Sequence, residues 1–255
     1  MKQFPPVVLA LIAINAVVFG LGAVMPDLGN AILSHGALFF PKNDAFHVGQ
    51  LFSYMFLHGS FGHILFNMFA LASFGAPLTM VWGWRRFLIF YFATGIGAAL
   101  IYTAANYYQF SAAYEVLLEA GYRADSIASL LETFKTDPTL AAKVPPETME
   151  SLLGIYHSRA VGASGAIYGI LVAFGVLFPN AKLSLIFLPI PIAAKYFIPV
   201  LVLLDLFSGV TGFSLFGAGI AHFAHVGGAV IGFLIMLYWK KNPPLGLAPK
   251  GRDAT

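Results

Sequence analysis

Long apolar runs alternate with polar segments along the chain. Six of these runs approach the roughly 20 residues that a helix needs to cross the hydrocarbon core of a bilayer. They cover residues 5–25, 61–82, 86–105, 162–179, 192–213 and 221–239. The pattern predicts an all-α, polytopic membrane protein built as a bundle of six transmembrane helices.

Two polar segments interrupt this pattern. Residues 26–60 contain apolar pieces that are too short to span, so we expect a folded, partly embedded loop there. Residues 106–159 are polar, of mixed charge and compatible with helices, and we expect an extracytoplasmic helical insertion. Two roles are open for it, a solvated cap and a substrate-sensing module. The expected organisation is therefore a transmembrane domain over 1–240, interrupted by the insertion, and a cytoplasmic tail over 241–255.

Composition narrows the class of protein. Hydrophobic residues make up 59% of the chain and charged residues 10%, whereas a soluble domain has about 25% charged residues. Cysteine is absent, which excludes disulfides, thiolate catalysis and cysteine-ligated metals. The sequence pI near 9.0 does not come from one basic patch, so we expect lipid and not nucleic acid as the partner of this chain. The apolar start up to Met25 lacks a clear cleavage site, which favours a retained first span over a signal peptide.

The distribution of charge predicts the orientation of the bundle. With a cytoplasmic N-terminus, the segments on the cytoplasmic side carry one acid, Asp253, and nine basic residues: Lys2, Arg85, Arg86, Lys182, Lys195, Lys240, Lys241, Lys250 and Arg252. Every glutamate falls on the opposite side. Lysine and arginine accumulate on the cytoplasmic side of membrane proteins, so we expect both termini there. An even number of spans meets that requirement.

Polar and ionisable side chains within spans are costly, and each is therefore a candidate for function. They are Asn15, His58, His63, Asn67, Ser164, Asp205, His222 and His225. Ser164 lies in Gly162-Ala163-Ser164-Gly165, at the start of the fourth expected span. Small neighbours leave its hydroxyl accessible, and Gly165 with Gly169 forms a spacing typical of tight helix contacts. By itself this motif is explained by helix packing alone, because serine is common where helices pack.

His225 lies in a second glycine-containing motif, in the last expected span. Gly228 and Gly232 repeat the same four-residue spacing, so this helix also has a face suited to close packing. On the predicted topology His225 lies at the same outer depth as Ser164. Two closely packed helices would bring the imidazole to the hydroxyl, as an activated serine requires. His222 lies one turn earlier, and a histidine at a helix end is the ordinary explanation for either one alone.

His63 and Asn67 form a third motif near the outer end of the second span. They are four residues apart and share one helix face, where both can donate hydrogen bonds to a developing oxyanion. A metal site built from the histidines is an alternative. Zinc catalysis on a helix would usually show His-Glu-x-x-His, and no apolar span contains a glutamate, so the sequence disfavours a metal.

Together the three motifs resemble the signatures of the rhomboid family, in matching order and in matching spans. The motifs are His63-x-x-x-Asn67, Gly162-x-Ser164-Gly165 and Ala224-His225-x-Gly227-Gly228-x-x-x-Gly232. The resemblance covers the six-helix core. It departs at Gly49-Gln50, where many members have Trp-Arg, and at the long segment 106–159.

This resemblance implies an intramembrane serine protease with a Ser–His dyad and no third, acidic member. Ser164 would be the nucleophile and His225 the general base, while His63, Asn67 and the Ser164 N–H would hold the oxyanion. Tyr168 matches a residue whose ring supports the catalytic imidazole, and Gly162 and Gly165 flank the nucleophile. Asp205 is expected to be structural or water-facing, because an aspartyl protease would need a second embedded aspartate.

The expected activity is cleavage of transmembrane segments of other membrane proteins near their extracytoplasmic ends, without a metal or cofactor. We expect a multi-pass protein of the plasma membrane whose active site opens to the extracytoplasmic side. One alternative is a non-catalytic relative that binds membrane proteins, although both members of the dyad are present. A transporter or channel is another, but inverted repeats and charges along a pathway are not visible in the sequence.

Overall fold

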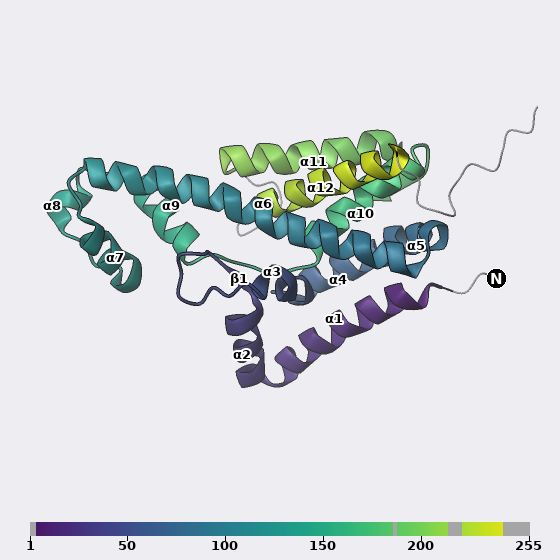
Figure 1. Ribbon diagram of the computed structural model, residues 1–255, viewed down its shortest axis with the longest axis horizontal. Coiled ribbons are helices and arrows are strands. Elements are labelled where there is room, and N and C mark those ends of the chain that lie inside the picture. The colour runs from purple at the N-terminus through teal and green to yellow at the C-terminus, as the bar shows by residue number, and fades with distance from the viewer. Residues whose placement is uncertain (1–3, 186–187, 214–220, 242–255) are drawn as a thin grey trace, which may run out of the picture. The chain divides into compact units, whose positions relative to one another are not determined.

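A computed structural model describes residues 4–185, 188–213 and 221–241 (Figure 1). Most of the described elements are helices: α1 (Pro6–Val24), α2 (Pro26–Gly36), α3 (Gln50–Ser53), η1 (Tyr54–Phe56), α4 (Phe61–Ala70), η2 (Leu71–Gly75), α5 (Ala76–Trp82), α6 (Trp84–Glu119), α7 (Ala124–Thr133), α8 (Pro138–Ala141), α9 (Pro146–Tyr156), α10 (Ser164–Leu177), α11 (Ala194–Thr211) and α12 (His222–Lys241). Nearly all of the predicted tail, from residue 242 onward, lies outside the described residues.

Two short antiparallel strand pairs accompany the helices, which the all-α prediction did not include. β1 (Leu38–Phe39) pairs with β2 (Arg159–Ala160), and β3 (Lys182–Leu185) pairs with β4 (Leu188–Ala193). β1 and β2 have two residues each, too few for the periodicity of a strand to be read from the sequence. The fold remains mostly helical.

Among the described residues, five helical segments are long and apolar enough to cross a membrane: Pro6–Val24, Phe61–Trp82, Trp84–Glu119, Ala194–Thr211 and His222–Lys241. They confirm the expectation of a polytopic membrane protein. The second of them contains a π-helical turn, η2, between α4 and α5.

The fourth expected span forms a shorter helix than predicted. Its apolar run begins at residue 162, but α10 has only 14 residues and is about 21 Å long at roughly 1.5 Å per residue. Ten to fourteen apolar residues are more typical of a buried helix than of one that spans lipid by itself. Eight of its residues are buried, since its small side chains allow neighbouring helices to approach.

The third span is longer than predicted. The expected end at residue 105 falls inside α6, whose 36 residues extend about 54 Å at roughly 1.5 Å per residue, against a hydrocarbon core of about 30 Å. The sequence from Ala98 to Ala120 contains no glycine or proline, so nothing in it ends the helix. Gly121, at φ +98°, follows the end of the helix. The polar segment that begins at residue 106 is therefore helical from its start.

The described residues group into two compact units. Unit 1 comprises Met1–Ala13, Leu65–Ala98 and Ser164–Thr255, and unit 2 comprises Ile14–Ile64 and Ala99–Ala163. In unit 1, α10 and α12 pack closely, and α11 lies against both. Near the C-terminal end of α12, Trp239 meets the rings of Trp82 and Phe90, with centroid distances of 5.1 and 5.8 Å.

Unit 2 has its own apolar core, which joins the end of α6 to α7 and α9. Its buried members include Phe110, Leu117, Ile127, Leu130 and Leu152. The amphipathic pattern of α7 explains why this polar segment folds, because three apolar positions face inward from an otherwise polar helix. The helical insertion predicted over 106–159 thus shares a core with the end of the preceding apolar helix.

Gln50 organises the loop predicted over residues 26–60. Its side chain is 1% exposed, and its Nε2 donates to the carbonyls of Ala45, at 2.7 Å, and His35, at 3.1 Å. Its Oε1 accepts a hydrogen bond from Phe39 N–H at 3.3 Å. The departure from the family pattern noted at Gly49-Gln50 therefore places a buried amide that ties α2 and β1 to α3.

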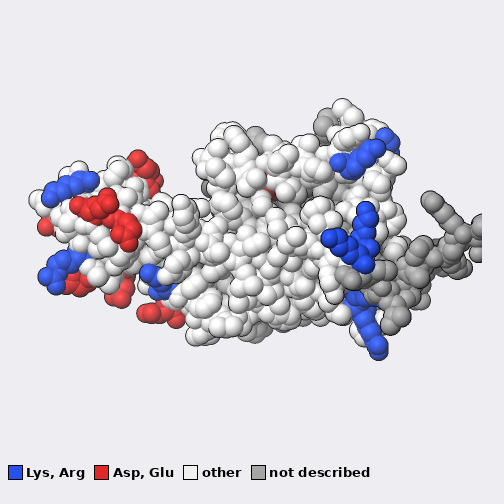
Figure 2. Space-filling view, turned by 45° about the horizontal axis from the view of Figure 1, so that its top comes forward, with Lys and Arg blue, Asp and Glu red and all other residues white. Residues whose placement is uncertain are grey.

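Charge separates sharply between the units. Among the described residues of unit 1 the only acid is Asp205, while the basic residues are Arg85, Arg86, Lys182, Lys195, Lys240 and Lys241. On the face drawn in Figure 2 the basic side chains of unit 1 gather at one end of that unit. All glutamates lie in unit 2. The described basic residues that the predicted orientation places on the cytoplasmic side therefore all belong to unit 1.

Candidate active site

Ser164 is the first residue of α10. Gly162, two residues earlier, has a φ of +124°, a conformation that side chains with a Cβ rarely adopt. Because the first N–H groups of a helix have no partner within the helix, the N–H at Ser164 is available to a ligand. The glycine before the serine thus allows the turn that puts both the hydroxyl and the amide at the start of the helix.

The glycine faces of α10 and α12 meet, as their spacing predicted. A Cβ added to Gly228 would overlap the carbonyl oxygen of Gly165. A Cβ on Gly232 would lie 2.7 Å from Cα of Gly169. The helices are therefore in backbone contact at both levels. This contact explains how residues 61 positions apart in the chain come within hydrogen-bond distance.

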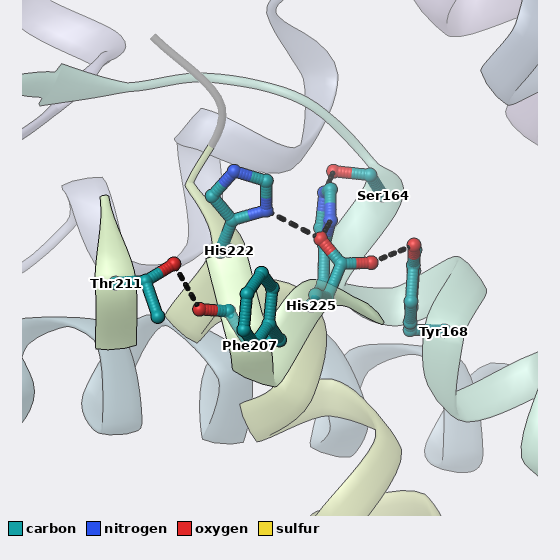
Figure 3. Close-up of polar contacts among 7 residues, drawn as sticks. Ser164, Tyr168, Phe207, Thr211, His222 and His225 are labelled. Carbon is teal, nitrogen blue, oxygen red and sulfur yellow. Dashed lines mark hydrogen bonds and ion pairs between the residues drawn. The ribbon is translucent and has the colours of Figure 1, made fainter. Parts of the chain in front are cut away.

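His225 faces Ser164 across this contact (Figure 3). Its Nε2 lies 2.8 Å from Ser164 Oγ, a normal hydrogen-bond length. The ring of Tyr168 stacks on the imidazole, with centroids 4.3 Å apart and planes 10° apart. Tyr168 lies on α10 one turn after Ser164, so one helix carries the hydroxyl and the ring that supports its partner.

Asp205 lies on the other side of His225, a contact that none of the sequence motifs predicted. Its Oδ1 is 3.1 Å from His225 Nδ1 and 2.6 Å from His222 Nδ1. Its Oδ2 accepts a hydrogen bond from the hydroxyl of Tyr168. Of the two expectations for Asp205, the water-facing one is wrong, since the residue is 7% exposed, and the carboxylate contacts the imidazole directly. The available signal was the cost of a carboxylate in an apolar span.

Asn67 and His63 lie one turn apart on α4, the first in unit 1 and the second in unit 2. Asn67 is 7% exposed, and its Nδ2 has no hydrogen-bond partner in the described part of the chain. A buried amide donor left unpaired is costly, which is consistent with a site that acts only when an acceptor arrives. His63 contacts the ring of His58 edge-on, with centroids 5.0 Å apart.

Among the described residues, the one group able to hold a metal ion consists of Asp205, His222 and His225, whose ligand atoms lie within 4.8 Å of one another. A metal there would replace the hydrogen bonds from both Nδ1 atoms to Asp205. His58 and His63 are not part of this group. Burial, and secondarily the charge of His63, lowers the pKa of His58 to about 3, so this imidazole is neutral at pH 7.

Comparison with known proteins identifies the family. A model of the rhomboid domain matches residues 45–117 and 139–242. The mouse protein named "Presenilin-associated rhomboid-like protein, mitochondrial" is 25% identical over 246 residues, covering 93% of this chain and 51% of that protein. "Rhomboid protein 1, mitochondrial" of Saccharomyces cerevisiae is 27% identical over 234 residues, covering 92% and 53%.

The chain spans about half the length of these curated relatives. The matched residues include the N-terminal turn of α10, α11 and α12, and so all the side chains that surround His225. On the evidence of the domain match and the helical membrane architecture, this chain belongs to the rhomboid family.

Proposed function

We propose that this chain is an intramembrane serine endopeptidase that cleaves transmembrane segments of other membrane proteins near their extracytoplasmic ends. The observation that carries the proposal is the 2.8 Å contact between Ser164 Oγ and His225 Nε2. A serine hydroxyl is a weak nucleophile at neutral pH, and an adjacent imidazole that accepts its proton activates it. Membership of the rhomboid family supports the same reaction.

In the proposed reaction, Ser164 Oγ forms a bond to the carbonyl carbon of the scissile peptide while its proton passes to His225 Nε2. The tetrahedral intermediate collapses, the C–N bond breaks, and His225 gives the proton to the leaving amine. Water then attacks the acyl-enzyme and loses a proton to His225. Ser164 leaves as a hydroxyl, which regenerates the enzyme and releases the carboxylic acid.

The negative charge that develops on the carbonyl oxygen needs hydrogen-bond donors. We assign this role to Ser164 N–H at the start of α10 and to the side chain of Asn67, both in unit 1, while the same role for His63 stays a prediction from the sequence. The unpaired Nδ2 of Asn67 supports the assignment, because it is a buried donor with nothing yet to bind. Donors of this kind act most strongly where water is excluded.

The distribution of charge supports an orientation with both termini in the cytoplasm. Arg85 and Arg86 begin α6, Lys195 begins α11, and Lys240 and Lys241 end α12, so these helix ends share one side. Ser164 and His222 begin α10 and α12 at the opposite helix ends. The active site would then open to the extracytoplasmic side. The plasma membrane stays our prediction for the location, while the two relatives named above are called mitochondrial.

A fluorophosphonate probe tests the activity directly, because it reacts with an activated serine. The purified protein should be labelled, and Ser164→Ala and His225→Ala should abolish labelling. Ser126→Ala, at an exposed serine on α7, serves as the matched control and should label fully. Cleavage of a helical membrane substrate in proteoliposomes should follow the same order. An unlabelled parent protein that still binds such a substrate would point to the non-catalytic alternative.

A further inference from the structure

Asp205 is the only acidic residue among the described residues of unit 1, and it is buried in an apolar helix. A carboxylate in such a place is expensive unless it is paired. Both of its oxygens have partners: Oδ1 faces the Nδ1 atoms of His222 and His225, and Oδ2 accepts from Tyr168. Three helices, α10, α11 and α12, therefore contribute to this cluster, in which Figure 3 labels Tyr168, His222 and His225.

The two ring nitrogens of His225 have different neighbours. Nε2 faces the hydroxyl of Ser164 at 2.8 Å, and Nδ1 faces Asp205 Oδ1 at 3.1 Å. An ionised carboxylate can only accept hydrogen bonds, so Nδ1 must carry the proton when it pairs with Asp205. Neutral imidazole has one N–H, and Nε2 is then left as an acceptor. This is the tautomer that a base for Ser164 needs.

We propose that Asp205 is a positioning residue for the reaction, which makes the site a Ser164–His225–Asp205 triad. The proposal rests on the proposed protease function and goes beyond the dyad that the family resemblance implies. Asp205 holds His225 in the productive tautomer and stabilises the imidazolium that forms when the Ser164 proton is transferred. No proton passes to Asp205 in this scheme.

Tyr168 and His222 complete the arrangement. The stacked ring of Tyr168 restricts the imidazole of His225, and its hydroxyl binds the second oxygen of Asp205. His222 donates to the oxygen that also faces His225, at 2.6 Å. Because both of its oxygens are hydrogen-bonded, the Asp205 carboxylate has a single orientation. The imidazole of His225 is then fixed by Tyr168, which stacks on its face, and by Asp205, which binds Nδ1 at its edge.

The test compares Asp205→Asn, Asp205→Glu and the matched control Thr211→Ala on the same helix. Asparagine is similar in size but presents an amide that can donate to Nδ1 and favour the wrong tautomer. We expect Asp205→Asn to slow fluorophosphonate labelling and substrate cleavage by up to about 10⁴-fold, the scale seen for this substitution in a serine protease. Asp205→Glu should recover part of the rate, and Thr211→Ala should match the parent. Labelling of Asp205→Asn should still reach completion, since the folded fraction is unchanged.

A second measurement does not depend on turnover. NMR of protein with isotope-labelled histidine should show a strongly downfield Nδ1–H proton of His225 in the parent and in Ser164→Ala, and not in Asp205→Asn. Loss of that signal from the parent would overturn the proposal even if Asp205→Asn failed to fold.

The outcomes separate the two proposals. A parent-like labelling rate in Asp205→Asn, together with an inert Ser164→Ala, would leave the protease function intact and refute the triad. A parent protein without labelling or cleavage would remove the protease function, and the positioning role with it.

Discussion

The backbone of Gly165 occupies the place that a side chain on Gly228 would need. A Cβ there would overlap the Gly165 carbonyl oxygen, and backbone cannot move aside as a flexible side chain does. The distance from Ser164 to His225 therefore depends on the absence of one methyl group on a facing helix, three residues after the histidine.

Gly228→Ala should force α10 and α12 apart and lower both activity and stability. Overpacking usually costs about 1–3 kcal/mol, and a clash with backbone should lie at or above the upper end of that range. Labelling by a fluorophosphonate should be nearly abolished, and the thermal unfolding temperature should fall. Gly20→Ala is the control, because a Cβ at Gly20 on α1 meets no atom within 4 Å. Parent-like labelling of Gly228→Ala would show that the helices do not meet as described.

Two substitutions at Tyr168 should separate the two roles of this side chain. Tyr168→Phe keeps the ring stacked on His225 and removes the hydroxyl that binds Asp205. Tyr168→Ala removes both. A hydrogen bond to a charged group contributes about 1.5–3 kcal/mol, so the Phe variant should react roughly tenfold more slowly, and the Ala variant more slowly still. Equal rates for the two variants would mean that the ring has no part in holding the imidazole.

Asn67→Ala should impair the chemical step more than substrate binding. Removal of one oxyanion donor costs about 10²–10³-fold in kcat, because the hydrogen bond forms fully only in the transition state. Steady-state cleavage should therefore show a lower kcat with a nearly unchanged KM. Asn30→Ala, at an exposed amide on α2, is the control. A rise in KM alone would assign Asn67 to substrate binding.

The absence of cysteine makes the orientation directly measurable. We expect Asp125→Cys, in the predicted extracytoplasmic insertion, to react with a membrane-impermeant maleimide in intact cells. Lys241→Cys, at the predicted cytoplasmic end of α12, should react only after the membrane is permeabilised. The opposite pattern would invert the positive-inside assignment and the side on which the active site opens.

The sequence by itself determined the class of protein, the chemistry-bearing motifs and the family. Apolar run length predicted the five long spanning helices, because backbone groups in lipid must be paired within a helix. The four-residue glycine spacings on two separate helices predicted their close contact. That contact in turn predicted that Ser164 and His225 would meet, as they do in the fold.

Helix ends were less predictable. The fourth span was expected to be full length, but hydropathy does not distinguish an apolar segment that faces lipid from one that faces other helices. The third span was expected to end where its polar residues begin, although α6 continues to Glu119 because its polar continuation still favours a helix. Hydropathy indicates where a segment can be buried, but it does not indicate where a helix begins or ends. Both errors follow from that difference.

The contact between Asp205 and His225 was decided only by tertiary structure. A single acidic residue in an apolar span is energetically unfavourable unless its carboxylate is paired, but the sequence does not indicate which residue it pairs with. The partner depends on how α11 is rotated and at what height it packs against α12, and these follow from packing over the whole of unit 1. Sequence spacing within one helix carries no information about either, and so the pair Ser164 and His225 was predictable while the third member was not.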